Sequence, residues 1–210
     1  MKEEEKDIYK DFEVLGKYYI KNEVVCRKVL YIKRKNKIKT INTPDLLVIM
    51  MNPGGSHPDY LNSYLEVRKK DCLDFVRAEP DKTQKQIMEV MKDKYHFACV
   101  LNLIDKCETK SSKLRSADKQ FSNFSEKSLG LKFIKEHAPS AKSVIIAWGC
   151  KSIFKPLIKN INSTIKGLKI EKIYAYPKTS DTENLYYYHP LPPNEDKRKE
   201  WIIEIQKQIK

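Results

Sequence analysis

An apolar run that stops abruptly on turn-forming residues constrains the fold of this chain more than any other stretch. Residues 46–51 read Leu-Leu-Val-Ile-Met-Met and are followed by the Asn-Pro-Gly-Gly of residues 52–55. A short apolar run between turn residues is typical of a strand that is buried on both faces, as in a parallel sheet. The loop after such a strand lies where α/β proteins bind ligands, although a tight strand-to-helix turn without chemistry has the same pattern.

Two further stretches repeat this pattern, at residues 96–104 and 143–149, and residues 168–176 and 185–188 are also β-prone. Elsewhere, apolar residues recur with the spacing of one helix face. The segments expected to be helical are residues 60–77, 83–91, 125–137, 153–158 and 195–210. Strands that alternate with helices predict an α/β protein, a three-layer α/β/α sandwich with a mainly parallel central sheet of about four strands.

The first 43 residues are expected to form an extension of this core. Ile8, Phe12, Leu15 and Tyr19 have the spacing of one helix face, so residues 3–20 are predicted to be a helix. Residues 24–33 and 38–41 are β-prone and flank a basic turn, which predicts a hairpin at the sheet edge. The chain is thus interpreted as one domain, residues 1–210, in which residues 1–43 extend a core of residues 44–210.

The charge of the chain indicates a polyanionic partner. Lys and Arg number 41 against 28 Asp and Glu, a formal net charge of +13. Such an excess attracts nucleic acid over roughly a Debye length, about 10 Å. Because most of the lysines are scattered along the chain, a merely solvated lysine-rich surface is the alternative interpretation. The expected partner is DNA, single- or double-stranded.

The remaining composition favours a cytoplasmic protein without a cofactor. The five cysteines include no Cys-x-x-Cys pair, so neither a disulfide framework nor a metal site is predicted. Apolar runs are too short to span a membrane, and residues 1–6 lack the apolar segment of a signal peptide. We expect a monomer in the cytoplasm that binds no membrane.

Polar residues end three of the β-prone segments. Asn52, Asn102 and His189 each follow or terminate an apolar run. If those segments are parallel neighbours, all three side chains point into one crevice. Gly54 and Gly55 permit positive φ and close approach of backbone N–H groups to a ligand. With Ser56 they could form an anion nest, but the loop lacks the Gly-Lys-Ser/Thr of a P-loop, so ATP hydrolysis is not expected.

Four short motifs occur along the chain in a fixed order. They are Met-Asn-Pro-Gly at residues 51–54, Val-Leu-Asn-Leu at 100–103, Ile-Ala-Trp-Gly at 146–149 and His-Pro-Leu-Pro-Pro at 189–193. In this order they resemble the landmarks of the uracil-DNA glycosylase superfamily. Over residues 25–193 the chain is also similar to the bacterial family known as domain of unknown function 1643, a name that carries no activity. The resemblance implies a uracil-DNA-glycosylase-like core.

The same resemblance implies roles for individual residues. By analogy, Asn52 would position the attacking water, Asn102 would hydrogen-bond an extruded base, and His189 would stabilise the charge of the departing base. Asn52 and His189 are therefore the catalytic candidates. Because an amide cannot ionise, Asn52 would hold water without deprotonating it, and the reaction would be slow.

Other candidates surround these three. An extruded base stacks on an aromatic ring, for which Tyr60, Tyr64 and Tyr188 are available, with Gly54 beside the base. The candidates for contacts with DNA phosphates are Ser56, Lys106, Lys110 and Lys113. Gly54 stands where some branches of the superfamily have an aromatic residue, and the motif at residues 189–193 lacks the serine that grips phosphate in relatives. Selectivity for uracil is therefore not implied.

The expected function is that of a DNA glycosylase-like repair enzyme, which hydrolyses the N-glycosidic bond of a damaged or modified base. One alternative is a module that recognises DNA or a modified base without cleaving it. Another is a hydrolase or transferase acting on a nucleotide, with residues 54–56 as the anion nest. The sequence does not name the base.

Overall fold

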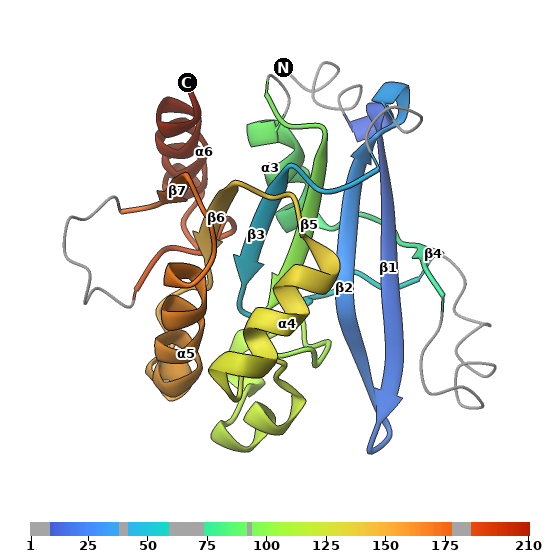
Figure 1. The fold of residues 1–210 in the computed structure, drawn as a ribbon, viewed down its shortest axis with the longest axis vertical. Coiled ribbons are helices and arrows are strands. Elements are labelled where there is room, and N and C mark those ends of the chain that lie inside the picture. The colour runs from blue at the N-terminus through green and yellow to red at the C-terminus, as the bar shows by residue number, and fades with distance from the viewer. Residues whose placement is uncertain (1–8, 38–41, 59–73, 92–93, 178–185) are drawn as a thin grey trace.

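The computed structural model describes residues 9–37, 42–58, 74–91, 94–177 and 186–210. Within them, seven strands form one sheet in the order β4-β1-β2-β5-β3-β6-β7 (Figure 1). Their bounds are β1 (Phe12–Lys21), β2 (Val24–Arg34), β3 (Leu46–Met50), β4 (Val76–Arg77), β5 (Phe97–Asn102), β6 (Ser143–Ala147) and β7 (Lys172–Ala175). Strands β5, β3, β6 and β7 run parallel, whereas β4, β1 and β2 pair antiparallel.

The α/β class predicted from the sequence is confirmed, but the predicted sheet is too small. Seven described strands form a mixed sheet, where about four mainly parallel strands were expected from the alternation of strands and helices. The additional strands are the antiparallel ones that come from the N-terminal residues and from residues 76–77. Strand β2 pairs with β5, so these antiparallel strands belong to the same continuous sheet as the parallel ones.

Four α-helices of the described residues cover the two faces of the sheet. Helices α3 (Lys82–Met91) and α6 (Glu195–Ile209) pack on one face, and α4 (Lys127–His137) and α5 (Lys155–Lys166) on the other (Figure 1). Strand β3 shows why the layers form: Leu46 and Val48 belong to the first core, and Leu47 and Ile49 to the second. Successive side chains of a strand point to opposite faces, so an entirely apolar strand needs helices on both.

The predicted N-terminal helix is wrong for residues 12–20, which belong to strand β1. Buried and partly exposed residues alternate along β1, and Phe12, Val14 and Tyr18 face the core. The expected helix face shares Phe12 but would have placed Tyr19 inside instead of Tyr18. Residues 9–11 form a short 3-10 turn, and residues 3–8 lie outside the described range.

The predicted hairpin exists, but with a different partner strand. β2 pairs with β1 across a two-residue turn at Asn22 and Glu23, whose φ angles are 50° and 62°. Positive φ at both positions matches the twist of a two-residue hairpin. Residues 38–41, expected to be the second strand, lie outside the described part, and residues 35–37 form a 3-10 turn.

The other predicted elements are mostly confirmed. Helices lie within or close to residues 83–91, 125–137 and 195–210, and a longer helix than expected follows residue 154. In the segment predicted to be helical at residues 60–77, residues 59–73 are not described and residues 76–77 form β4. Of residues 185–188, Tyr187 makes an isolated bridge with Gly149. Among the helices described, none combines the length and apolarity needed to cross a bilayer.

A buried carboxyl group beside the hairpin yields a first prediction. Asp105 is 1% exposed, and its Oδ2 accepts hydrogen bonds from Tyr19 Oη at 2.8 Å and Asn123 Nδ2 at 2.6 Å. Burial raises the pKa of Asp105 to about 8, against the opposing effect of these donors. The folded state therefore binds an extra proton between about pH 4 and pH 8, so wild-type stability falls as the pH rises through this window.

Asp105→Asn is expected to remove this dependence. The amide oxygen can still accept from Tyr19 and Asn123, and the side chain does not ionise. From pH 5 to pH 9 the stability of Asp105→Asn should increase relative to wild type by roughly 2–4 kcal/mol. Urea unfolding at pH 5, 7 and 9 measures the difference, with the exposed Asp196→Asn as control. Parallel pH profiles for Asp105→Asn and wild type would contradict the prediction.

Candidate functional site

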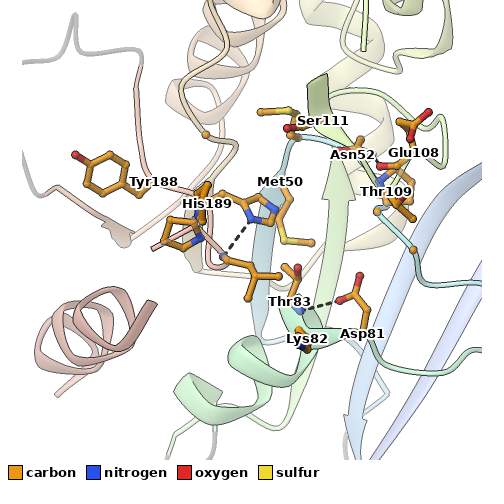
Figure 2. Close-up of a pocket in the computed structure, with 18 of the residues that line it drawn as sticks. Met50, Asn52, Asp81, Lys82, Thr83, Glu108, Thr109, Ser111, Tyr188 and His189 are labelled. Carbon is orange, nitrogen blue, oxygen red and sulfur yellow. Dashed lines mark hydrogen bonds between the residues drawn. The ribbon is translucent and has the colours of Figure 1, made fainter. Parts of the chain in front are cut away.

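A cavity of about 870 Å³ opens at the carboxyl ends of β3 and β6, next to the start of α3 (Figure 2). Pockets for small ligands commonly measure about 300–1,000 Å³, so a nucleotide would fit. The cavity is lined by residues 50–55 after β3, 81–84 at the start of α3, 108, 109 and 111 after β5, 149–151 after β6, and 188, 189, 191–194 and 197 near the C-terminus.

The parallel strands explain why these distant segments meet. Met50, the last residue of β3, pairs with Asn102 of β5 and with Ala147 of β6, so the three strands end at one level. Their loops therefore open at the same edge of the sheet. At Gly149, with φ +78°, a Cβ atom would stand 2.8 Å from Met51 Cε and 3.9 Å from His189 Cβ. Glycine is needed here because it allows both the backbone conformation and the close packing.

His189 enters the cavity as a neutral hydrogen-bond donor. Its Nδ1 accepts a hydrogen bond from the N–H of Leu191 at 3.1 Å (Figure 2). Burial lowers the pKa of His189 to about 4, although the charge of Asp81 acts in the opposite direction. At neutral pH the imidazole is therefore uncharged, and because Nδ1 accepts, the proton resides on Nε2. Nε2–H is available to a bound ligand.

Asp81 supplies a carboxylate that the sequence analysis did not single out. Its Oδ1 caps α3 by accepting from the N–H groups of Thr83 at 2.8 Å and Gln84 at 3.0 Å, and Gln84 Oε1 accepts from Asp81 N–H at 2.7 Å. The second oxygen, Oδ2, takes no part in this cap and lies 3.1 Å from where a Cβ of Gly54 would stand. The signal was present in the sequence, because Asp81 and Gln84 have the spacing of a capping box.

Asn52 is held firmly in the wall of the cavity. It is 8% exposed, and its Nδ2 donates to the carbonyl of Glu108 at 2.7 Å and to that of Lys106 at 3.5 Å. These bonds join the loop after β3 to the loop after β5. The amide nitrogen is therefore occupied, and Oδ1 is the atom with which Asn52 could hold a ligand or a water molecule.

The structure brings four of the predicted site residues to this cavity: Asn52, Gly54, Tyr188 and His189. Gly54 has φ +68°, a conformation that favours glycine. The ring of Tyr188, however, points away from His189 (Figure 2). Its centroid lies 5.4 Å from that of the Tyr176 ring and 5.4 Å from Lys197 Nζ, a cation–π contact. Neighbouring residues in an extended segment face opposite ways, so the ring of Tyr188 does not enter the cavity beside His189.

Other predicted residues lie elsewhere. Asn102 is fully buried and is not among the described residues that line the cavity. Ser56 is 1% exposed, and its hydroxyl donates to the carbonyl of Glu79 at 3.2 Å. Tyr60 and Tyr64 lie outside the described residues.

Of the lysines predicted to contact phosphate, Lys106 pairs with Asp118 at 3.0 Å, whereas Lys110 and Lys113 are exposed. Lysines that the sequence analysis did not single out line the cavity itself, namely Lys82, Lys151 and Lys197. Two of them, Lys82 and Lys197, are exposed. Together with the acidic Asp81 and Glu108, these three lysines leave a small excess of positive charge in the lining, which favours an anionic ligand.

The fold and the cavity define an α/β protein with a candidate ligand site beyond the carboxyl ends of its parallel strands. The chain belongs to the family described as Protein of unknown function (DUF1643), whose family model matches residues 74–191. This span contains Asp81, Asn102 and His189, whereas Asn52 and Gly54 precede it. No curated protein matches the chain.

Proposed function

We propose that the protein hydrolyses the N-glycosidic bond of a damaged or modified base in DNA, and that its core is related to the uracil-DNA glycosylases. The observation that carries the proposal is the meeting of a neutral histidine, His189, and a carboxylate, Asp81, in a cavity that could hold a nucleotide (Figure 2). The ordered motifs around Asn52, Asn102, Trp148 and His189 agree with it.

The reaction requires two opposite charges to be stabilised at once. Cleavage passes through a state in which the sugar becomes cationic and the departing base becomes anionic. Nε2–H of His189 donates to the base as its charge develops. Oδ2 of Asp81, which takes no part in the cap, stabilises the sugar cation and accepts a proton from the attacking water, which Oδ1 of Asn52 helps to hold.

DNA reaches this cavity with one nucleotide extruded from the helix. Lys82, Lys151 and Lys197 at the opening, together with the exposed Lys110 and Lys113, contact the flanking phosphates. Each phosphate contact releases a counterion, so affinity should fall steeply with salt. Asn102 does not line the cavity, but Met50, its pairing partner on β3, does. Asn102 hydrogen-bonds the base only if the ligand reaches past Met50.

A glycosylase assay tests the proposal. Purified protein is incubated with oligonucleotides carrying uracil, mismatched thymine, hypoxanthine or a bulky modified cytosine, and abasic sites are then cleaved with alkali. We expect strand scission at one of these bases, unchanged in Glu171→Gln, an exposed substitution outside the cavity. Scission of none of them contradicts the proposal.

The same assay separates the alternatives when binding is measured beside cleavage. Salt-dependent binding to a modified oligonucleotide without scission would indicate a recognition module. Affinity for free nucleotides that does not depend on DNA length would indicate a hydrolase or transferase acting on small molecules.

A further inference from the structure

Arg27 is a buried cation that forms no ion pair with the described residues. Its side chain is 0% exposed, Nε, Nη1 and Nη2 make no hydrogen bond of regular geometry, and the phenol of Tyr18 beside it is uncharged. A guanidinium stays protonated in proteins, so it cannot escape the cost of burial by losing its charge. An unpaired buried charge strongly destabilises a fold, and one that is retained calls for an anionic partner.

Arg27 lies directly behind one wall of the cavity. It is opposite Tyr18 in the β1–β2 ladder, and Tyr18 Oη donates to the carbonyl of Ser56 at 3.2 Å. On its other side, Arg27 N–H donates to the carbonyl of Asp105 at 2.9 Å. Burial and then the charge of Arg27 lower the pKa of His57. The charge of Arg27 also acts on the ionisable groups of Asp105 and Cys107, so the guanidinium lies near His57 on one side and near residues 105–107 on the other.

These two segments continue into the cavity wall. Gly54, Gly55, Glu108 and Thr109 all line the cavity. A Cβ atom on Gly55 would stand 3.1 Å from Thr109 Cγ2, so the two loops touch. Arg27 is not among the residues that line the cavity, so a ligand reaches it only when this contact and the hydrogen bonds from Asn52 to the carbonyls of Lys106 and Glu108 give way.

Asn102 adds a second unpartnered group on the same side of the sheet. It is 0% exposed, and neither Nδ2 nor Oδ1 has a hydrogen-bond partner in the described structure. Asn102 follows Val100 by two residues, so both point toward the core under α3 and α6, where Tyr18 also lies. Arg27, the cross-strand partner of Tyr18, shares that face.

The nearby carboxyl group of Asp105, whose pKa burial raises to about 8, is protonated at neutral pH and does not neutralise Arg27. Its Oδ2 accepts from Tyr19 and Asn123, and Oδ1 has no partner. Tyr19 follows Tyr18 in β1 and therefore faces the opposite side of the sheet from Arg27. The five unpartnered atoms of Arg27 and Asn102 thus lack a counterpart within the described chain.

We propose that Arg27 and Asn102 form an inner anion-binding end of the cavity, which takes a phosphate or carboxylate group of the ligand when residues 54–57 and 106–109 separate. A guanidinium binds two oxygens of such a group at once, and the amide of Asn102 donates to a further one. The inference rests on the proposed function only in naming the substrate: the target nucleotide or base then carries an anionic oxygen-bearing group.

Thermal unfolding with inorganic phosphate tests this site. Wild type, Arg27→Met and Arg77→Met are unfolded in rising phosphate at constant ionic strength, with chloride as the compensating anion. Arg77 is an exposed arginine, with a side chain 74% exposed, and is the matched control. Phosphate should raise the Tm of wild type and Arg77→Met to a plateau, because a ligand stabilises the state that it binds. It should not raise that of Arg27→Met.

For the same variant we expect an effect of opposite sign on Tm when chloride is the only anion. There Arg27→Met should unfold at a higher temperature than wild type, by roughly 2–10 °C, because an apolar side chain replaces an unpaired charge. Asn102→Leu should raise the half-saturating phosphate concentration about tenfold. A phosphate response of Arg27→Met equal to that of wild type, or an Arg27→Met protein that unfolds earlier or fails to fold, overturns the proposal.

Two further comparisons identify the ligand and separate this inference from the proposed function. Stabilisation by a nucleoside monophosphate beyond that by phosphate assigns the site to a nucleotide phosphate, and stabilisation by acetate at equal charge assigns it to a carboxylate. A phosphate response that depends on Arg27 in a protein that cleaves no modified oligonucleotide keeps the anion site and removes the glycosylase. Cleavage of a modified oligonucleotide by a protein that shows no Arg27-dependent phosphate response keeps the glycosylase and removes the anion site.

Discussion

Replacing Asp81 by asparagine is expected to lower the rate of base release by about 100-fold or more while leaving the stability of the fold nearly unchanged. The two functions of the side chain reside on different oxygens. Oδ1 accepts from Thr83 and Gln84 at the start of α3, and an asparagine oxygen caps a helix equally well. Oδ2, in contrast, would be replaced by an uncharged NH₂ group that can neither stabilise a cation nor accept a proton from water.

Asp81→Ala provides the matched comparison, because it removes the cap as well as the charge. It should lower the rate to a similar degree and also cost about 1 kcal/mol of stability. Single-turnover cleavage of the oligonucleotide that wild type processes gives the rate, and urea unfolding gives the stability. A wild-type rate in Asp81→Asn would show that Asp81 only caps α3.

Replacing His189 is expected to have the other large effect. Asparagine at position 189 can still accept from the N–H of Leu191, as Nδ1 does at 3.1 Å, but it does not reach the position of Nε2. Loss of one hydrogen bond to a developing anion lowers kcat by roughly 100- to 1,000-fold. Glutamine extends an N–H group to the position of Nε2, so His189→Gln should recover about tenfold of the loss. Equal rates for His189→Asn and His189→Gln would exclude donation from Nε2.

The pH dependence of stability tests the state of His189 independently of catalysis. The folded pKa of about 4 lies below the pKa of the unfolded chain, because burial disfavours the imidazolium. The unfolded state therefore binds the extra proton, and stability is lost as the pH falls from about 6.5 through about 4. His189→Gln should lack this part of the loss, amounting to roughly 1–3 kcal/mol between pH 7 and pH 4. Identical pH profiles for wild type and His189→Gln would contradict a neutral, partly desolvated imidazole.

The sequence identified the elements whose burial is visible locally. Residues 46–50 are apolar without interruption, and helix α6 carries Trp201, Ile205 and Ile209 on one buried face. Strand β1 was misread because Phe12, Leu15 and Tyr19 fit a helix face, while Phe12, Val14 and Tyr18 fit a strand face. Pairing with β2 across the turn at Asn22 and Glu23 decided between them, and a single segment does not contain that information.

The candidate site divides in the same way. Asn52 and Gly54 were placed at the cavity from the sequence because the loops after parallel strands converge on one edge, whereas His189 reaches it from a segment that makes only an isolated antiparallel bridge, between Tyr187 and Gly149. Asp81 and Lys151 were missed because they come from the start of a helix and the loop after β6, where polar residues are ordinary. Asn102 was expected in the cavity, but it is fully buried and is not among the described residues that line the cavity.

By itself, therefore, the sequence determined the α/β class, the buried strands β3, β5 and β6, and the polar residues at the cavity edge, because hydrophobic periodicity and turn chemistry are local properties. Only the tertiary structure decided that the N-terminal residues join the sheet, that Asp81 faces His189 across a cavity, and that Arg27 is buried without a partner. These features depend on which strands pair and which side chains lose contact with water, and both are fixed when distant segments pack together.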